Sequence, residues 1–187
     1  MTPAEYALTL IRGETEGKHP LLVAIDGRCA SGKTTLAGEL SAVLGCPVVH
    51  MDDFFLRPEQ RTPERLAEPG GNLDRERFLE EVLLPLTAGK RVSYRPFVCK
   101  TMSLGDPVEI SPSSVVLIEG SYSCHPALRD FYHLRFFLSV DPAAQISRLL
   151  TREGADRLKA FEEKWIPMEE TYIRECGVTD ACVLLNP

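Results

Sequence analysis

The stretch AIDGRCASGKTTLAGEL, residues 24–40, restricts the fold of this chain more than any other segment. It begins apolar, passes through a loop with Gly27 and Gly32, and continues into a helix-like pattern. Together with Lys33 and Thr34, the two glycines fill the pattern G-x-x-x-x-G-K-[ST] without a gap. A strand before this pattern and a helix after it are the setting in which such a loop surrounds phosphate groups. The sequence therefore predicts a phosphate-binding loop between a buried strand and a helix.

Each residue type in this pattern has a physical role in binding phosphate. Gly27 permits a sharp exit from the strand, and Gly32 lets the backbone approach phosphate closely. Successive N–H groups and the helix N-terminus supply donors and a positive dipole to a β-phosphate. Lys33 adds a mobile positive charge, and Thr34 offers a hydroxyl to Mg²⁺. We expect nucleotide contacts from residues that share this loop: Gly27, Ala30, Ser31, Gly32, Lys33, Thr34 and Thr35.

Short apolar runs recur along the chain and indicate the strands of an α/β fold. They lie at residues 21–25, 47–50, 114–119, 134–140 and 181–185. Most are continuously apolar, as expected when helices cover both faces of a parallel sheet. Helical patterns alternate with them, which indicates right-handed crossovers and an open sheet.

Capping residues predict where three of these helices begin or end. Gly45 is expected to terminate the helix that follows the phosphate loop. Asp74 is a plausible N-cap for a helix whose buried stripe includes Phe78 and Val82. Asp141 and Pro142 form a cap and first-turn pair for a third helix.

Two segments interrupt the alternation. Residues 56–72 are rich in proline, glycine and charge, and we expect a long surface loop there. Residues 91–110 contain two short β-like pieces around a turn, which predicts a small hairpin insertion. Long irregular insertions in a compact domain are often functional.

Bulk properties exclude several classes of protein. A length of 187 residues suits one domain, and a net charge of −6 argues against a binder of duplex nucleic acid. The six cysteines are scattered, so reduced thiols in a cytoplasmic protein are expected. The N-terminus carries acids and no long apolar run, so we expect neither a signal peptide nor a membrane partner. Self-association is left open.

Acidic residues follow two of the predicted strands. Asp52 and Asp53 come just after the second strand, and Glu119 ends the strand at 114–119. The carboxyl ends of strands border the ligand crevice of an open α/β sheet. Glu119 therefore lies where an acid would hold Mg²⁺ or its water. His50, at the end of the second strand, is expected to be a core or edge histidine.

At this point the chain resembles a known family. IDGRCASGKTTLA, HMDDFF, NLDRERF, LIEGSY and DPAAQISRLLTRE follow in the order seen in the uridine kinase and phosphoribulokinase-like P-loop kinases. The resemblance extends from about residue 20 to residue 185. It implies transfer of the γ-phosphate of ATP, with Mg²⁺, to a hydroxyl of a small acceptor, most often a nucleoside. It also implies a P-loop kinase fold: a five-stranded, mainly parallel sheet with flanking helices.

The resemblance assigns further roles along the chain. One domain is expected over residues 1–187, with an acceptor-side insertion at about 56–110 that includes the hairpin and a helical lid at about 148–165. Asp52 matches the acid that orients or deprotonates the acceptor hydroxyl, and we place it with Thr34 and Glu119 around the metal.

Other matches assign the acceptor pocket and the lid. Asp74 matches the aspartate that holds ribose hydroxyls, and Tyr94 and Phe97 lie in the hairpin that supplies aromatic rings against the base. Asp53 completes the expected acceptor contacts. Arg148 and Arg152 match arginines at the start of the lid.

The residues themselves support the lid assignment. The spacing of Arg148 and Arg152 puts both guanidinium groups on one helix face. Together with Lys33 and Asp52 they form the expected catalytic set, because such cations can neutralise charge on a transferring phosphoryl group.

Departures from the family pattern keep the acceptor open. Arg75 follows Asp74 where uridine kinases carry histidine, and the segment from Tyr94 to Lys100 lacks their Y-D-F-x-x-H histidine. Pantothenate, nicotinamide riboside or a sugar phosphate are alternative acceptors. A P-loop ATPase or switch without an acceptor is a further alternative, although the chain has no N-K-x-D guanine motif.

Overall fold

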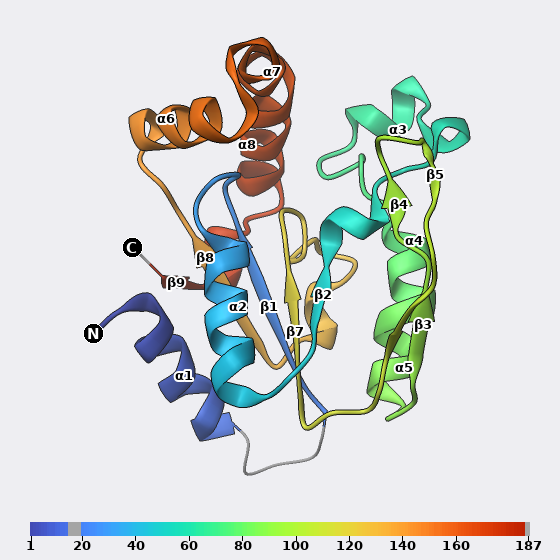
Figure 1. The fold of residues 1–187 in the computed structure, drawn as a ribbon, viewed down its shortest axis with the longest axis vertical. Coiled ribbons are helices and arrows are strands. Elements are labelled where there is room, and N and C mark those ends of the chain that lie inside the picture. The colour runs from blue at the N-terminus through green and yellow to red at the C-terminus, as the bar shows by residue number, and fades with distance from the viewer. Residues whose placement is uncertain (15–19, 186–187) are drawn as a thin grey trace.

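Five apolar segments form one parallel sheet in the order β2-β7-β1-β8-β9 (Figure 1). We analysed a computed structural model, which describes residues 1–14 and 20–185. The strands are β1 (Leu21–Gly27), β2 (Val48–His50), β7 (Val115–Glu119), β8 (Leu134–Leu138) and β9 (Val183–Leu185). All four pairings are parallel, so the predicted α/β sheet is confirmed.

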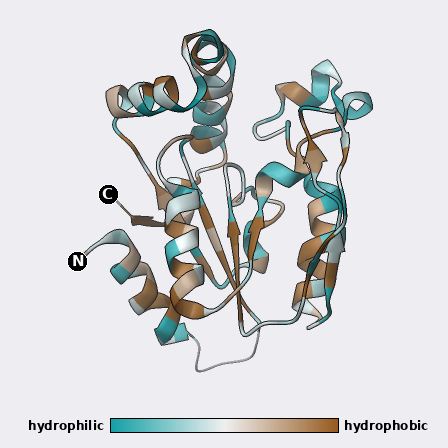
Figure 2. Cartoon of the chain, in the orientation of Figure 1, coloured by the Kyte–Doolittle hydropathy of each residue, from teal (hydrophilic) through white to brown (hydrophobic). Residues whose placement is uncertain are grey.

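Alternate residues of the strands point into two separate hydrophobic cores. In β1, Leu22 and Ala24 belong to one core, whereas Leu21, Val23 and Ile25 belong to the other. All seven residues of β1 are buried. This explains why the strand is continuously apolar instead of alternating, since both faces of the sheet are covered. Figure 2 shows the apolar residues gathered along these central strands.

Helices α1 (Pro3–Glu14) and α2 (Lys33–Leu44) cover one face of the sheet. Leu36 and Leu40 of α2 are buried there, one helical turn apart. Gly45 ends α2 in the left-handed conformation at φ +64°, and its N–H donates to Ser41 O. The predicted glycine stop is therefore confirmed.

A helical segment over residues 75–87 contributes to the core on the other face. It consists of α4 (Arg75–Phe78), a π-helical turn (Leu79–Leu83) and α5 (Leu84–Thr87). Asp74 caps α4, as predicted, because its side chain accepts from the N–H of Arg77. Pro85 lacks an N–H and cannot continue a regular hydrogen-bond ladder, which accounts for the irregular turn just before it.

Two antiparallel pairs and a short helix form the acceptor-side insertion. β3 (Val92–Tyr94) pairs with β6 (Val108–Ile110), and β4 (Phe97–Val98) pairs with β5 (Ser103–Leu104), so the predicted hairpin is confirmed. The prediction of a long surface loop over 56–72 was wrong in part. This segment contains a 3-10 turn (Pro58–Gln60) and α3 (Pro63–Ala67). Thr62 caps α3 by accepting from the N–H of Arg65.

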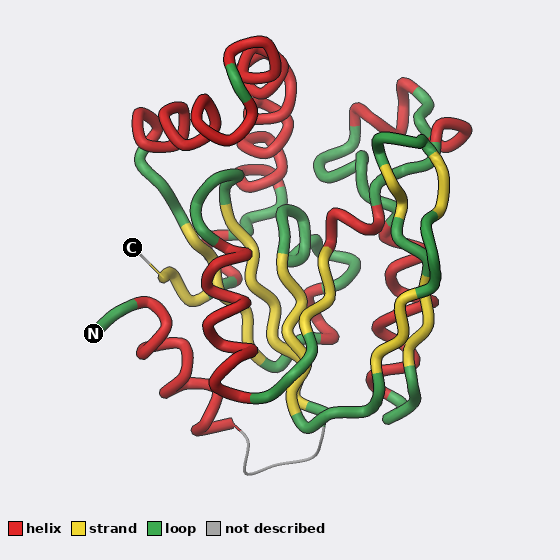
Figure 3. The backbone as a smooth tube through the Cα atoms, viewed as in Figure 1, coloured by secondary structure: helices red, strands yellow, loops and turns green. Residues whose placement is uncertain are grey.

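A run of helices follows β8 and includes the predicted lid at about 148–165; the whole run is called the lid below. α6 (Pro142–Glu153) leads to α7 (Ala155–Ala160), a π-helical turn (Phe161–Trp165) and α8 (Ile166–Glu175). Asp141 caps α6 through the N–H groups of Ala143 and Ala144, which confirms the predicted start. Figure 3 shows the lid and the acceptor-side insertion rising on opposite sides of the strand ends.

Three further 3-10 turns complete the described structure: Met51–Phe54, Arg129–Phe131 and Thr179–Ala181. All six cysteines are unpaired, as expected from their spacing. Within the described residues, no helix combines the length and the apolar character needed to cross a membrane. The single domain predicted over 1–187 includes residues 15–19 and 186–187, which lie outside the described residues.

Candidate active site

A cleft of about 1140 Å³ lies above the phosphate loop, between the lid and the acceptor-side insertion. The carboxyl ends of β1, β2 and β7 form its floor, where the crevice of an open parallel sheet is expected. Its walls bring together residues far apart in sequence: the loop residues 29–35, Asp52, Glu119, and the lid cations Arg148, Arg152, Arg157 and Lys164. The cleft is large enough for two small ligands.

The phosphate loop adopts backbone conformations that its glycines permit. Gly27 has φ +147°, and a Cβ there would lie 2.2 Å from Leu138 O on the neighbouring strand. Gly32 has φ +103° at the N-cap of α2. Ala30 between them is left-handed at φ +59°, a conformation that is unfavourable for a residue with a side chain. The first N–H groups of α2 have no acceptor within their own helix and are directed toward the loop.

The side chain of Lys33 extends back over the phosphate loop that precedes it. Its Nζ donates to Gly27 O at 2.7 Å and to Arg28 O at 2.8 Å, and the side chain is only 8% exposed. These two carbonyl groups hold the ammonium group above the loop. A role of this charge at the β- and γ-phosphates stays a prediction.

Thr34 and Glu119 meet at the floor of the cleft. Thr34 Oγ1 lies 3.3 Å and 3.4 Å from the two carboxylate oxygens of Glu119, which is almost fully buried. His50 Nδ1 lies 2.5 Å from Glu119 Oε1, and this contact raises the pKa of His50. The expectation that His50 is a core or edge histidine was therefore incomplete, because its ring contacts the acid of the site.

Asp52 follows β2 at the mouth of the cleft. The carboxylate is part of the cleft wall, near Glu119 and Lys33. Desolvation by the walls and the negative charge of Glu119 raise the pKa of Asp52 above its ordinary value. A carboxylate with a raised pKa is a better proton acceptor than one with an ordinary pKa.

Asp26, just before the loop, links three parts of the molecule. Its carboxylate accepts from Gly27 N at 2.6 Å, Cys124 N at 2.8 Å and Tyr172 Oη at 2.7 Å. The side chain is 1% exposed, and desolvation raises its pKa from 3.8 to about 6. Sequence reasoning did not single out Asp26, although a charged residue inside an apolar strand was a usable signal.

The raised pKa of Asp26 predicts a pH-dependent stability. The folded protein binds this proton more tightly than the unfolded chain, so the contribution is fully present below about pH 4. It is lost as the pH rises through about 6, by about 3 kcal/mol for a shift of about two units. Urea unfolding of the wild type and of Asp26→Asn, measured from pH 4 to 7, should give a free-energy difference that changes by that amount. A difference independent of pH would contradict the prediction.

The lid arginines line the cleft opposite the acceptor-side insertion. Arg148 Nη1 donates to Ala30 O at 3.0 Å. Arg152 and Arg157 both pair with Glu153, at 2.8 Å and 2.9 Å. Glu153 thus holds two cations together at the cleft wall. The structure brings the predicted Arg148 and Arg152 to one side of the cleft, and it adds Arg157 to them.

Asp53 and Tyr94 bond to each other instead of lining the cleft. Tyr94 Oη donates to Asp53 Oδ2 at 2.9 Å, and the Tyr94 ring is buried against Phe54. Arg77 lies over the Phe54 ring and donates to Asp53 O at 2.8 Å. Among the described residues, the cleft lining includes neither Asp53 nor Tyr94. These two predicted acceptor contacts form a supporting layer behind it.

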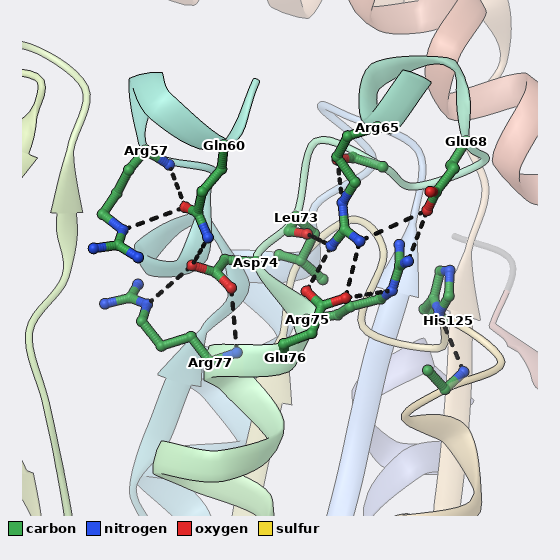
Figure 4. Close-up of polar contacts among 12 residues, drawn as sticks. Arg57, Gln60, Arg65, Glu68, Leu73, Asp74, Arg75, Glu76, Arg77 and His125 are labelled. Carbon is green, nitrogen blue, oxygen red and sulfur yellow. Dashed lines mark hydrogen bonds and ion pairs between the residues drawn. The ribbon is translucent and has the colours of Figure 1, made fainter. Parts of the chain in front are cut away.

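Asp74 is also engaged by protein groups. Its Oδ2 accepts from Gln60 Nε2 at 2.9 Å and its Oδ1 from Arg77 N, as Figure 4 shows. Asp74 is 2% exposed and is not part of the cleft lining found in the described residues. Phe97 is likewise buried, under the guanidinium group of Arg61. The structure therefore does not bring these two predicted acceptor contacts to the cleft surface.

Different residues face the acceptor half of the cleft. They share positions on the 55–72 segment and at the tip of the hairpin: Phe55, Leu56, Arg61, Leu66, Asn72, Cys99 and Met102. Asn72 is 6% exposed, and its Oδ1 has no hydrogen-bond partner among the described residues. No sequence pattern distinguished these positions, because proline, glycine and charge dominate the segment that carries most of them.

Comparisons with known proteins agree with this geometry. The chain is 27% identical over 176 residues to uridine-cytidine kinase B of Dictyostelium discoideum, which covers 85% of this chain and 72% of that protein. It is 32% identical over 167 residues to nicotinamide riboside kinase 2 of Homo sapiens, which covers 83% and 68%. No family model matches the chain.

One solved structure establishes the likeness of the fold. A possible uridine kinase from Bacillus stearothermophilus superimposes with a TM-score of 0.75, covering 98% of this chain and 97% of that one. Its sequence identity is 22%, so the shared feature is the architecture.

Proposed function

This chain belongs to the uridine kinase-like P-loop kinases, and from that premise we propose that its acceptor is a nucleoside or a similar sugar-bearing alcohol. The chain is an ATP-dependent phosphotransferase with a hydroxyl group as acceptor. One observation carries the proposal. One cleft is lined by the phosphate loop, by Glu119 at its floor and Asp52 at its mouth, and by the lid and the 55–72 segment on its two sides.

The donor half is formed by the phosphate loop and the lid. We assign the β- and γ-phosphates of ATP to the N–H groups of the loop and to Lys33. The lid arginines Arg148 and Arg152 are assigned to the charge that develops on the transferring phosphoryl group. Arg152 pairs with Glu153 at 2.8 Å, so a phosphoryl group would compete with Glu153 for that guanidinium group.

The residues at the floor fit a Mg²⁺ ion. No group of three or more histidine, cysteine or acidic side chains in the described residues could hold a metal by itself. Protein sites for Mg²⁺ in kinases supply one or two oxygen ligands and leave the others to phosphate and water. Thr34 Oγ1 and the carboxylates of Glu119 and Asp52 are such ligands. When bound, the ion would neutralise charge on the phosphates.

Asp52 is assigned to the acceptor hydroxyl. In-line transfer needs the hydroxyl oxygen directed at the γ-phosphorus and its proton removed as the bond forms. The carboxylate lies at the boundary between the donor and acceptor halves, next to Lys33 and Glu119. A carboxylate held beside the acceptor hydroxyl can accept that proton.

The acceptor half combines an apolar wall with few polar groups. Phe55, Leu66 and Met102 offer contacts to a ring, while Arg61 and the side chain of Asn72 are the polar groups of the same wall. An acceptor with both a ring and several hydroxyl groups suits this composition. Asp74, Tyr94 and Phe97 are then proposed to support this wall from behind, with Asp53.

A screen for acceptor-dependent ADP formation tests the proposed function. The panel contains uridine, cytidine and nicotinamide riboside, and then pantothenate and sugar phosphates as acceptors of other classes. We expect turnover with at least one ribonucleoside and none with the other classes. ATP hydrolysis that does not depend on any acceptor, and that is unchanged in Asp52→Asn, would contradict the assignment.

Asn72→Ala is predicted to affect the acceptor and not the donor. Loss of a hydrogen bond to a neutral group corresponds to about 0.5–1.5 kcal/mol, so we expect the KM for the acceptor to rise about 3- to 10-fold. The KM for ATP should stay within about twofold of the wild type. Steady-state kinetics with each substrate varied in turn measures both. Equal changes in the two constants would contradict the assignment of Asn72 to the acceptor half.

A further inference from the structure

The rim of the phosphate loop, residues 28–30, is bonded to the lid. Two consecutive acids of α8 reach it. Arg28 donates from Nε and Nη2 to Glu170, at 2.5 Å and 2.9 Å. Cys29 N donates to Glu169 Oε2 at 2.8 Å. Tyr172, one turn further along the same helix face, donates to Asp26. Helix α8 therefore contacts both the rim and the strand end that leads into it.

The other lid helix, α6, completes the rim. Gln145 Nε2 donates to Cys29 O at 3.0 Å, and Arg148 Nη1 donates to Ala30 O at 3.0 Å. Gln145 is 4% exposed, so its contact is a buried one. The backbone around Cys29 is consequently held from α6 at the carbonyl group and from α8 at the N–H group.

The rim needs these contacts because of the backbone conformation of Ala30. Ala30 is left-handed at φ +59°, and a non-glycine residue keeps that conformation only where its surroundings determine it. The N–H groups that follow at Gly32 and Lys33 are among those predicted to surround the phosphates, whereas that of Ser31 donates to Arg28 O at 3.1 Å. A change at Cys29 or Ala30 would therefore redirect the donors of the site.

Glu169 is the more deeply buried of the two acids of α8 that contact the rim. It is 3% exposed, and its second oxygen, Oε1, accepts from Ser121 Oγ. Ser121 lies two residues after Glu119, and it also lines the cleft. The carboxylate thus joins the rim of the loop to the segment that follows the acid at the floor. Its negative charge near the phosphate site is unfavourable for binding an anion, so its benefit must come from geometry.

We propose that Glu169 is a positioning residue for the nucleotide: from α8 it fixes the N–H of Cys29 and so holds the phosphate loop in the conformation that receives ATP. This inference rests on the proposed function, because it takes the loop to be the ATP site. In this proposal the lid first organises the phosphate loop and later covers the bound nucleotide. Glu169, which has this role, lies outside every motif found in the sequence.

Two substitutions separate geometry from charge. Glu169→Asp keeps the charge but shortens the side chain, so the carboxylate can no longer reach both Cys29 N and Ser121 Oγ. Glu169→Gln removes the charge but keeps the length: its oxygen can accept from Cys29 N, while its amide group faces the Ser121 hydroxyl. Glu175→Gln and Glu175→Asp are matched controls, because Glu175 is an exposed acid on the same helix.

Calorimetric titration with ATP and Mg²⁺, without an acceptor, measures the effect on the full chain. We expect Glu169→Asp to raise the Kd about tenfold, and Glu169→Gln to leave it within about threefold of the wild type. Both controls should match the wild type. In kinetics, Glu169→Asp should raise the KM for ATP and leave the KM for the acceptor unchanged.

Three results would overturn the proposal. If Glu169→Asp lowers the melting temperature while the Kd for ATP is unchanged, Glu169 only stabilises the fold. If Glu169→Gln weakens ATP binding as much as Glu169→Asp, the contact with Cys29 N that glutamine can keep does not sustain ATP binding, and the positioning role fails. If the wild type does not bind ATP, the proposed function fails as well. Tight ATP binding without any acceptor turnover would count against the proposed acceptor alone, and the Glu169 series would still decide the positioning role.

Discussion

Replacing Asp52 with asparagine is expected to lower kcat about 10²- to 10⁴-fold, the range that a positioned general base contributes. The amide has the size of the carboxylate but cannot accept the proton of the acceptor hydroxyl. The Kd for ATP should change by less than about threefold, because the phosphates are assigned to the loop and not to Asp52. Single-turnover assays with saturating ATP and acceptor measure the chemical step, and calorimetry measures binding.

An exposed aspartate provides the matched control. Asp106→Asn, in the hairpin, removes the same charge away from the cleft and should leave kcat unchanged. A fall in kcat that is fully explained by weaker ATP binding would contradict the role of Asp52. It would indicate that the carboxylate acts on the donor side, through the metal.

Replacing Lys33 with methionine is expected to affect both binding and chemistry. Methionine has nearly the same length but no charge, so neither the ground-state phosphates nor the charge of the transition state is neutralised. We expect kcat/KM for ATP to fall about 10²- to 10³-fold, comparable to the loss of one preorganised donor in other enzymes. Initial rates at varied ATP with saturating acceptor measure the change.

The position of Lys33 makes Lys33→Arg an informative companion variant. Nζ fits between two backbone carbonyl groups that lie 2.7 Å and 2.8 Å away, in a site where Lys33 is almost fully buried. A planar guanidinium group is larger and has a fixed geometry, so we expect arginine not to restore activity. Lys159→Met, on the exposed side of the lid, is the control for loss of one positive charge. Full activity of Lys33→Arg would show that charge alone is sufficient.

The donor half of the site was predictable because its determinants are local. The spacing of Gly27, Gly32, Lys33 and Thr34 defines one loop geometry, and a strand and a helix must flank it. Glu119 follows a continuously apolar strand, and parallel strands bring their carboxyl ends to one edge of the sheet. Caps at Asp74 and Asp141, and the stop at Gly45, are likewise set by residues within a few positions.

The acceptor half was less predictable because other protein groups already bond to the side chains that were predicted to bind the acceptor. Asp74 has the residue type of a ribose ligand, but Gln60 and the N–H of Arg77 occupy its two oxygens. Tyr94 donates to Asp53, and both are withdrawn from the cleft lining of the described chain. These pairings join segments 14 and 41 positions apart, and no local pattern specifies them.

The sequence by itself determined the parallel sheet, the phosphate loop and the edge of the sheet where the proposed active site lies. Periodicity, glycine positions and caps are short-range properties, and each has few structural solutions. Tertiary structure alone decided which acids are free to meet a ligand and which are engaged by the protein. It also decided that Glu169, 140 positions from Cys29, holds the rim of the loop. The reason is that a buried polar group must find a partner wherever the chain brings one, and packing over long sequence distances selects that partner.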